Sequence, residues 1–193
     1  MDTAQRGMGL DWPTSRELIQ RTLQAASTVP GARVASGCGT DHLDLSDVRQ
    51  LEDVIRAYDE QIEAIESMGG QLIIMASRAL VKVARSPADY EQVYDHILSQ
   101  VREPVILHWL GDMFDPALAG YWGHTDLDRA TNTALDVIRS HASKVDGIKV
   151  SLLDKDREIA IKAYEAADPA LRQCLDMIAD TMNSVLRSEE HTS

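Results

Sequence analysis

Short apolar runs alternate with longer stretches of helical periodicity along this chain, and this alternation constrains its fold most strongly. The apolar runs lie at residues 33–36, 71–75, 104–109 and 145–150. They are mostly continuous, as expected for strands that are covered on both faces. Parallel strands need crossover connections, and the spacing between successive runs leaves room for one helix each time. The sequence therefore predicts an α/β fold in which parallel strands alternate with helices.

The segments between these runs have the periodicity of amphipathic helices. Helices are predicted over residues 14–28, 47–67, 87–100 and 126–142. Thr14-Ser15-Arg16-Glu17 has the pattern of a capping box, Ser86-Pro87 offers an N-cap and a first-position proline, and Thr125 is a third candidate N-cap. No glycine-rich phosphate-binding motif follows any of the apolar runs, which argues against nucleotide binding.

Charge and composition narrow the choice of partners. The chain of 193 residues holds 19 Lys and Arg against 31 Asp and Glu, a formal net charge of −12. This balance disfavours nucleic acid and anionic membranes, because both are polyanions. No apolar run approaches the roughly 20 residues of a membrane helix, and the N-terminus lacks a signal-peptide pattern, so we expect a cytoplasmic protein. Cys38 and Cys174 are too far apart in sequence to indicate a disulfide framework or a zinc knuckle.

Lys149 is the most informative residue at the ends of the predicted strands, where parallel α/β folds collect functional groups. A lysine in a buried strand must carry its ammonium to the open end of the sheet or lose its charge. A neutral lysine amine attacks a carbonyl and forms a Schiff base, which assists cleavage of an adjacent C–C bond. The alternative is a structural lysine that extends to solvent or pairs with Asp146 or Asp154.

Other residues at these strand ends suggest further chemistry. Arg78 fits either a bidentate contact with a substrate carboxylate or an ion pair within the chain. His108, Asp112 and Asp41 define a second hypothesis, a metal-dependent enzyme, although no pair has H-x-x-x-H spacing. Cys38 lies between two glycines and is expected to be a small buried residue. Four aromatic residues suggest either a pocket wall or a packed loop: Trp109, Phe114, Tyr121 and Trp122.

The segment 145–151, Val-Asp-Gly-Ile-Lys-Val-Ser, resembles the Gly-Ile-Lys strand of the dihydrodipicolinate synthase and N-acetylneuraminate lyase superfamily. Residues 104–108 resemble the preceding strand of that family, and residues 33–40 resemble its V-x-x-G-x-G strand. More closely, residues 1–161 resemble a dihydrodipicolinate-synthase-like group that shares the phrases MDTAQRGMGLDW, LIIMASRAL and PVILHWLGDMFDPALAGYWG.

This resemblance implies a partial (β/α)₈ TIM barrel and a lyase of the class I aldolase type that acts on a small 2-oxoacid. Lys149 corresponds to the Schiff-base lysine, and His108 replaces the proton-relaying tyrosine of the family. No cofactor and no metal are expected, and the parent protein is expected to form a homo-oligomer. The candidate substrate-binding residues are Thr3, Ser77, Arg78 and Ser151.

Two motifs of the family are replaced in this chain, and these replacements bear on the expected substrate. Residues 2–7 replace the Gly-Thr-Thr-Gly-Glu stretch and residues 76–78 replace a Pro-Tyr-Tyr, so the substrate is expected to differ from that of the synthase.

Residues 1–161 are expected to supply about five of the eight barrel strands. Residues 162–186 form a predicted helical segment that does not match the family, and residues 187–193 resemble a translated sequencing adapter. Because a barrel needs closure, we expect the polypeptide alone to be inactive. A third hypothesis is a non-catalytic barrel remnant that binds a small molecule or serves as an oligomer contact.

Overall fold

A computed structural model describes residues 9–152 of the chain, and a parallel sheet forms its centre. The four strands are β1 (Ala35–Cys38), β2 (Gln71–Met75), β3 (Val105–Leu110) and β4 (Val145–Ser151), and they lie side by side in that order. Every pairing is parallel. The four predicted strands are therefore confirmed, and so is the α/β class.

The four predicted helices are also present in the described residues. They are α2 (Trp12–Ala26), α3 (Leu51–Ser67), α5 (Pro87–Gln100) and α6 (Leu127–Ser140). The bounds of α5 match the prediction because Ser86 forms a reciprocal capping box with Asp89 and a proline follows it. Helix α3 begins later than predicted, since Gln50 caps it and exchanges hydrogen bonds with Asp53.

Two predicted caps are wrong by one to three residues. Asp11, and not Thr14, caps α2: its Oδ1 accepts a hydrogen bond from the Thr14 backbone nitrogen at 2.8 Å. Asp126, and not Thr125, caps α6 by accepting from the Arg129 nitrogen at 2.9 Å. In both places a charged acceptor adds a favourable interaction with the helix dipole, which explains why the carboxylate takes the cap.

Short helical segments connect the main elements. Helix α4 (Arg78–Val83) follows β2 and escapes prediction because its six residues are too few to show a helical period. The 3₁₀ turns are η1 (Pro116–Leu118), η2 (Tyr121–Gly123) and η3 (Ala142–Lys144). None of the helices in the described part of the chain is long and apolar enough to cross a membrane.

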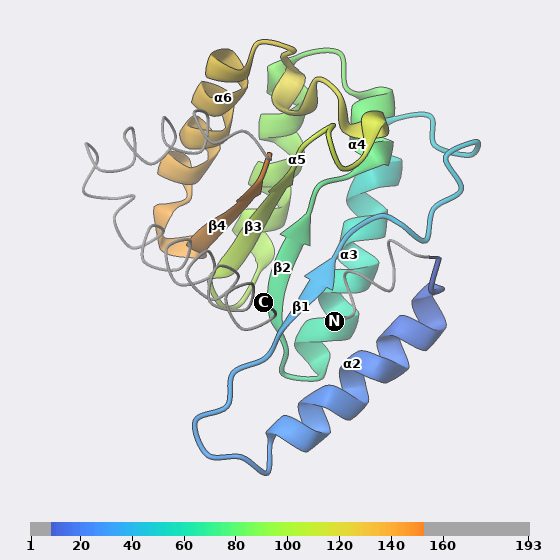
Figure 1. The fold of residues 1–193 in the computed structure, drawn as a ribbon, viewed down its shortest axis with the longest axis vertical. Coiled ribbons are helices and arrows are strands. Elements are labelled where there is room, and N and C mark those ends of the chain that lie inside the picture. The colour runs from blue at the N-terminus through green and yellow to red at the C-terminus, as the bar shows by residue number, and fades with distance from the viewer. Residues whose placement is uncertain (1–8, 153–193) are drawn as a thin grey trace, which may run out of the picture.

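Helices α3, α5 and α6 all cover the same face of the sheet (Figure 1). Strand residues that point to these helices are buried in the core, among them Ile74, Leu107 and Ile148. We call the opposite sheet face the open face. Because side chains alternate along a strand, the open face carries Met75, His108 and Lys149.

Candidate functional site

Lys149 and His108 are neighbours on the open face. They are register partners in the β3–β4 pair, where adjacent strands lie about 4.8 Å apart. His108 is 7% exposed, whereas the Lys149 side chain is exposed. The fold thus brings together the two predicted catalytic residues, on the side of the sheet that faces away from α3, α5 and α6.

The His108 ring is held from both sides. Its Nδ1 lies 3.3 Å from Met75 Sδ, and its Nε2 lies 3.2 Å from Ser151 Oγ. Burial, and to a smaller extent the positive charge of Lys149, lowers the pKa of His108 to about 4. The imidazole is therefore neutral near pH 7 and is a weaker base than an ordinary histidine.

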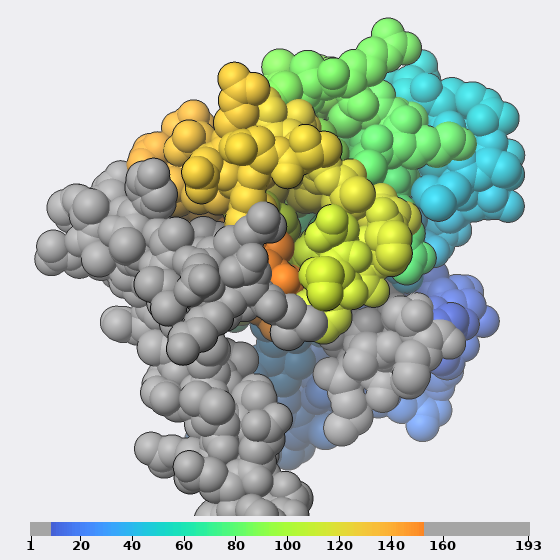
Figure 2. Space-filling model, turned by 45° about the horizontal axis from the view of Figure 1, so that its top comes forward, coloured from blue at the N-terminus to red at the C-terminus, as the bar shows by residue number. Residues whose placement is uncertain are grey.

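Ser151, one of the predicted substrate-binding residues, ends β4 beside the loop that follows β3. Its carbonyl accepts a hydrogen bond from the Gly111 nitrogen at 2.9 Å. The space-filling view shows the orange end of β4 next to this yellow-green loop (Figure 2). The strand end and the loop therefore form one border of the site.

Ser77, a second predicted substrate-binding residue, forms its hydrogen bonds within the chain. Its hydroxyl caps α4 by accepting from the Leu80 nitrogen at 3.0 Å and shares a 2.6 Å hydrogen bond with the Thr40 hydroxyl. Its backbone nitrogen donates to the Tyr121 hydroxyl at 3.1 Å. Ser77 is 1% exposed, so its polar atoms position the end of β2 in this structure.

Arg78 forms an ion pair with Asp115 of the loop after β3. Of the two alternatives that the sequence left open, this arrangement is the ion pair within the chain. The guanidinium remains 54% exposed, while the Asp115 side chain is 16% exposed. The remaining candidate, Thr3, lies outside the described residues.

The three residues of the metal hypothesis do not come together. Within residues 9–152, no group of three or more His, Cys, Asp or Glu side chains is placed to hold a metal ion. Asp41 and Asp112 are exposed at the ends of β1 and β3, and His108 contacts Met75 and Ser151 instead. Cys38 is fully buried, as predicted.

The aromatic residues near β3 are mostly packed into the core. Trp109, Tyr121 and Trp122 are each at most 3% exposed, and the Trp122 and Tyr94 ring centroids are 4.6 Å apart. Phe114 is the exception, with 50% exposure. Of the two alternatives from the sequence, the packed loop describes Tyr121 and Trp122.

One polar cluster near the end of β1 was missed by sequence reasoning. The Gln61 carboxamide, fully buried on α3, accepts from the Gly39 nitrogen at 2.8 Å and lies 2.8 Å from His42 Nδ1. The His42 Nε2 lies 3.3 Å from a Glu60 carboxylate oxygen. The available signal was Gln61, a polar residue on the apolar side of the helix predicted over residues 47–67. A buried amide needs polar partners, so its position indicated a polar cluster.

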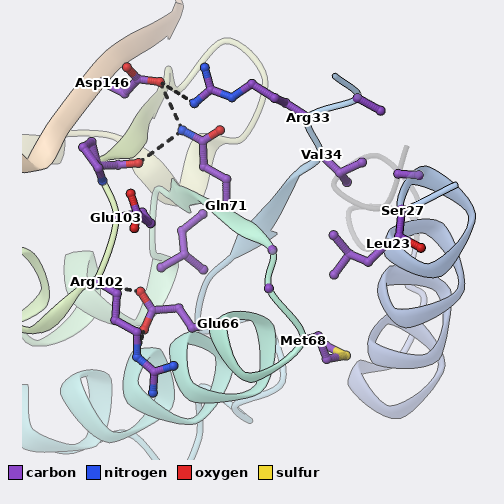
Figure 3. A pocket seen from close by; sticks show the side chains of 16 residues that line it. Leu23, Ser27, Arg33, Val34, Glu66, Met68, Gln71, Arg102, Glu103 and Asp146 are labelled. Atoms are coloured by element: carbon purple, nitrogen blue, oxygen red, sulfur yellow. Dashed lines mark hydrogen bonds and ion pairs between the residues drawn. The ribbon is translucent and has the colours of Figure 1, made fainter. Parts of the chain in front are cut away.

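A hollow of about 500 Å³ lies at the opposite end of the sheet, between α2 and the N-terminal ends of the strands (Figure 3). There the Gln71 amide donates to the Pro104 carbonyl at 3.2 Å and to an Asp146 oxygen at 3.1 Å. Arg33 approaches the same Asp146 oxygen at 3.8 Å. These contacts connect the beginnings of all four strands.

Comparison with known proteins identifies one family. A family model described as "Protein of unknown function (DUF993)" matches residues 1–172. The match extends past residue 161, the expected end of the barrel-like domain. No curated protein matches the chain.

Proposed function

We propose for this chain, which belongs to the DUF993 family, a Schiff-base-forming lyase activity of the class I aldolase type toward a 2-oxoacid. Lys149 is the nucleophile and His108 is the proton relay. One observation carries the proposal: the exposed amine and a buried imidazole of lowered pKa are register partners on one open sheet face. An amine beside a neutral base is the arrangement that carbonyl attack requires.

We further propose that the sheet is part of a (β/α)₈ barrel, as the resemblance to the synthase and lyase superfamily implies. Two features support this. The strands follow one another in chain order, and the helices between them lie on one face. A doubly wound sheet instead reverses its strand order and has helices on both faces. In a barrel the open face points inward, so Lys149 and His108 face the interior.

The first chemical steps need a free lysine amine and a neighbouring group that moves protons. The Lys149 ammonium releases a proton to water, and the free amine adds to the C2 carbonyl of the 2-oxoacid. The neutral His108 imidazole moves a proton from the amine nitrogen to the oxygen, and then a proton from water to the resulting carbinolamine hydroxyl, which leaves as water. A protonated imine between Lys149 and C2 remains.

The protonated imine then draws the electron pair of the C3–C4 bond. As that bond breaks, the pair forms the C2–C3 double bond of an enamine, and the C4 hydroxyl loses its proton to a base and becomes an aldehyde. Protonation of C3 and hydrolysis of the imine release a shorter 2-oxoacid and regenerate the Lys149 amine. In this proposal Ser151 donates a hydrogen bond to the substrate carboxylate, and Arg78 keeps its ion pair with Asp115.

Borohydride trapping tests this proposal. A DUF993 protein long enough to complete a barrel is incubated with pyruvate and borohydride, and the labelled residue is located by peptide mass spectrometry. We expect a reduced adduct on the lysine that corresponds to Lys149 and none in the Lys→Met variant, with Lys82→Met as the control. An unlabelled lysine would exclude the mechanism and favour a non-catalytic binding protein.

The same treatment of the present chain tests the expectation that it is inactive alone. We expect no specific label, because the strands described here do not close a barrel. A specific label on Lys149 of this chain would contradict that expectation while supporting the role of the lysine.

A further inference from the structure

We infer that a pocket at the C-terminal ends of β1, β2 and β3 receives an aliphatic side chain of the substrate. The substrate class is then a 4-hydroxy-2-oxoacid whose remaining chain is apolar, branched or linear, and not a polyhydroxylated acid. This inference rests on the proposed function, because it takes Lys149 as the point where the carbonyl is held.

The pocket adjoins His108, because Met75 lines the pocket and also contacts the His108 ring. It has a volume of about 170 Å³, and Met75 and Leu110 form its wall toward the open face. Met75 Sδ is 3.3 Å from His108 Nδ1, and Leu110 is the register partner of Ser151. Met75 lies on β2, two strand spacings or about 10 Å from β4, and Leu110 lies two residues beyond His108, the register partner of Lys149. A ligand bound at Lys149 therefore needs a chain of several carbon atoms to reach the pocket.

The rest of the pocket wall is mainly apolar. Leu43, Leu45, Ala79 and Leu118 contribute to it, and Ala79 and Leu118 are at most 3% exposed. The sequence places these residues on three different segments: the loop after β1, helix α4 and the turn η1. The fold thus gathers aliphatic side chains from separate loops around one space, which is typical of a small-molecule site.

The polar residues of the pocket are already engaged with one another. Arg78 is paired with Asp115, and the Thr40 hydroxyl is 2.6 Å from that of Ser77. Asp41 is exposed and lies toward solvent. A ligand chain rich in hydroxyl groups would leave these groups unpaired against the leucines, and a buried polar group without a partner disfavours binding.

The pocket size sets the length of the side chain. At about 30 Å³ for a water-sized group, a volume of 170 Å³ admits roughly five non-hydrogen atoms. Each methylene moved from water into such a site strengthens binding about fourfold. A four- or five-carbon chain is therefore preferred over the methyl group of pyruvate.

The test uses 4-methylpentanoate, which has the aliphatic chain but no carbonyl that could condense with Lys149. The full chain is labelled with ¹³C at Met and Leu methyl groups and titrated in separate NMR experiments with 4-methylpentanoate, acetate and gluconate. We expect saturable shifts at Met75, Leu110 and Leu118 with 4-methylpentanoate, and an affinity at least tenfold above that for acetate and gluconate.

Two variants and a control complete the test. Ala79→Leu fills the pocket, and Leu45→Asp places a charge in its half-exposed wall without removing core volume, so each is expected to weaken binding at least tenfold. The exposed Ala142→Leu, outside the pocket, is expected to bind as the unaltered protein does. Equal affinities for 4-methylpentanoate and gluconate, or binding unaffected by both pocket variants, would overturn the inference. Failure of borohydride trapping would leave these results unchanged, so the two proposals fail separately.

Discussion

At the scale of single residues, His108 combines burial with a cationic neighbour. Both lower its pKa, with burial as the larger cause. The unfolded chain binds a proton on this histidine near its ordinary pKa of 6.5, whereas the folded chain stays neutral down to about pH 4. Between these values the unfolded state holds more protons, so stability falls as the pH falls through this window and is unaffected above it.

We therefore predict that His108→Gln removes part of the acid destabilisation. A shift from 6.5 to about 4 corresponds to roughly 3 kcal/mol of unfolding free energy lost between pH 7 and pH 4. Urea unfolding at a series of pH values measures this loss in both proteins. The exposed Ala142→Gln, which adds no titratable group, serves as control and should keep the pH dependence of the unaltered chain. If the free energy of unfolding changed with pH equally in the unaltered chain and in His108→Gln, the prediction would be contradicted.

A second prediction at this scale concerns the coupling of Lys149 to His108. In Lys149→Met the pKa of His108 should rise, because a repelling positive charge is gone, yet it should stay below 6.5 because the ring remains buried. Titration of the imidazole by NMR gives the pKa directly. Lys82→Met, whose lysine contacts the Leu45 carbonyl instead, should leave the pKa in place. An unchanged His108 pKa in Lys149→Met would show that the two groups are not neighbours.

At the scale of elements, the turn η2 attaches the loop after β3 to helix α5. Trp122 adopts φ 66, the only positive φ of a non-glycine residue among residues 9–152, and its ring is 1% exposed. A left-handed residue costs about 1–2 kcal/mol, which burial of the indole among Tyr90 and Tyr94 offsets. The loop that borders the candidate site is thus held in place from its far side.

Gly123 of this turn supplies the matching prediction. It has φ +80, and an added Cβ would lie 2.7 Å from the Pro87 nitrogen at the start of α5. Gly31 has a similar φ of +78 with nothing within 4 Å of such an atom. Gly31→Ala should cost about 1 kcal/mol from backbone strain, and Gly123→Ala more, because the turn must also move away from α5. Urea unfolding compares the two, and equal losses would contradict the close contact.

At the scale of the whole molecule, the contacts that join the strand beginnings and the proposed catalytic pair lie toward opposite ends of the sheet. The N-terminal ends of the strands are joined through Gln71, Asp146 and Arg33, while Lys149 and His108 lie toward the C-terminal ends. This division fits the proposed barrel, because in such barrels the loops after the strands carry function.

Asp146→Ala and Lys149→Met should therefore have opposite effects. The first removes an acceptor of the Gln71 amide and should lower the unfolding free energy by about 1 kcal/mol, with 4-methylpentanoate binding retained. The second alters an exposed side chain and should leave stability within about 0.5 kcal/mol, while a barrel-complete relative with the same change loses the borohydride adduct. Urea unfolding and trapping measure the two effects, and a loss of both properties in either variant would contradict the division.

Much of the secondary structure could be predicted because it depends on local patterns. Periodicity located every main strand and helix, and Ser86-Pro87 set the start of α5. The caps at Asp11 and Asp126 were mistaken because Thr14 and Thr125 lie within three residues and have the same chemistry. Helix α4 was missed because its one and a half turns leave no measurable period.

By itself, the sequence determined the α/β class and the order of the elements, and it identified Lys149 and His108 as candidate catalytic residues. Only the tertiary structure decided which residues meet. Strand register made Lys149 and His108 partners and joined Ser151 to the imidazole. Packing paired Arg78 with Asp115 in an ion pair, and it brought leucines from separate loops around one pocket. The physical reason is that periodicity is a property of neighbouring residues, whereas register and pocket lining depend on contacts between segments far apart in the chain.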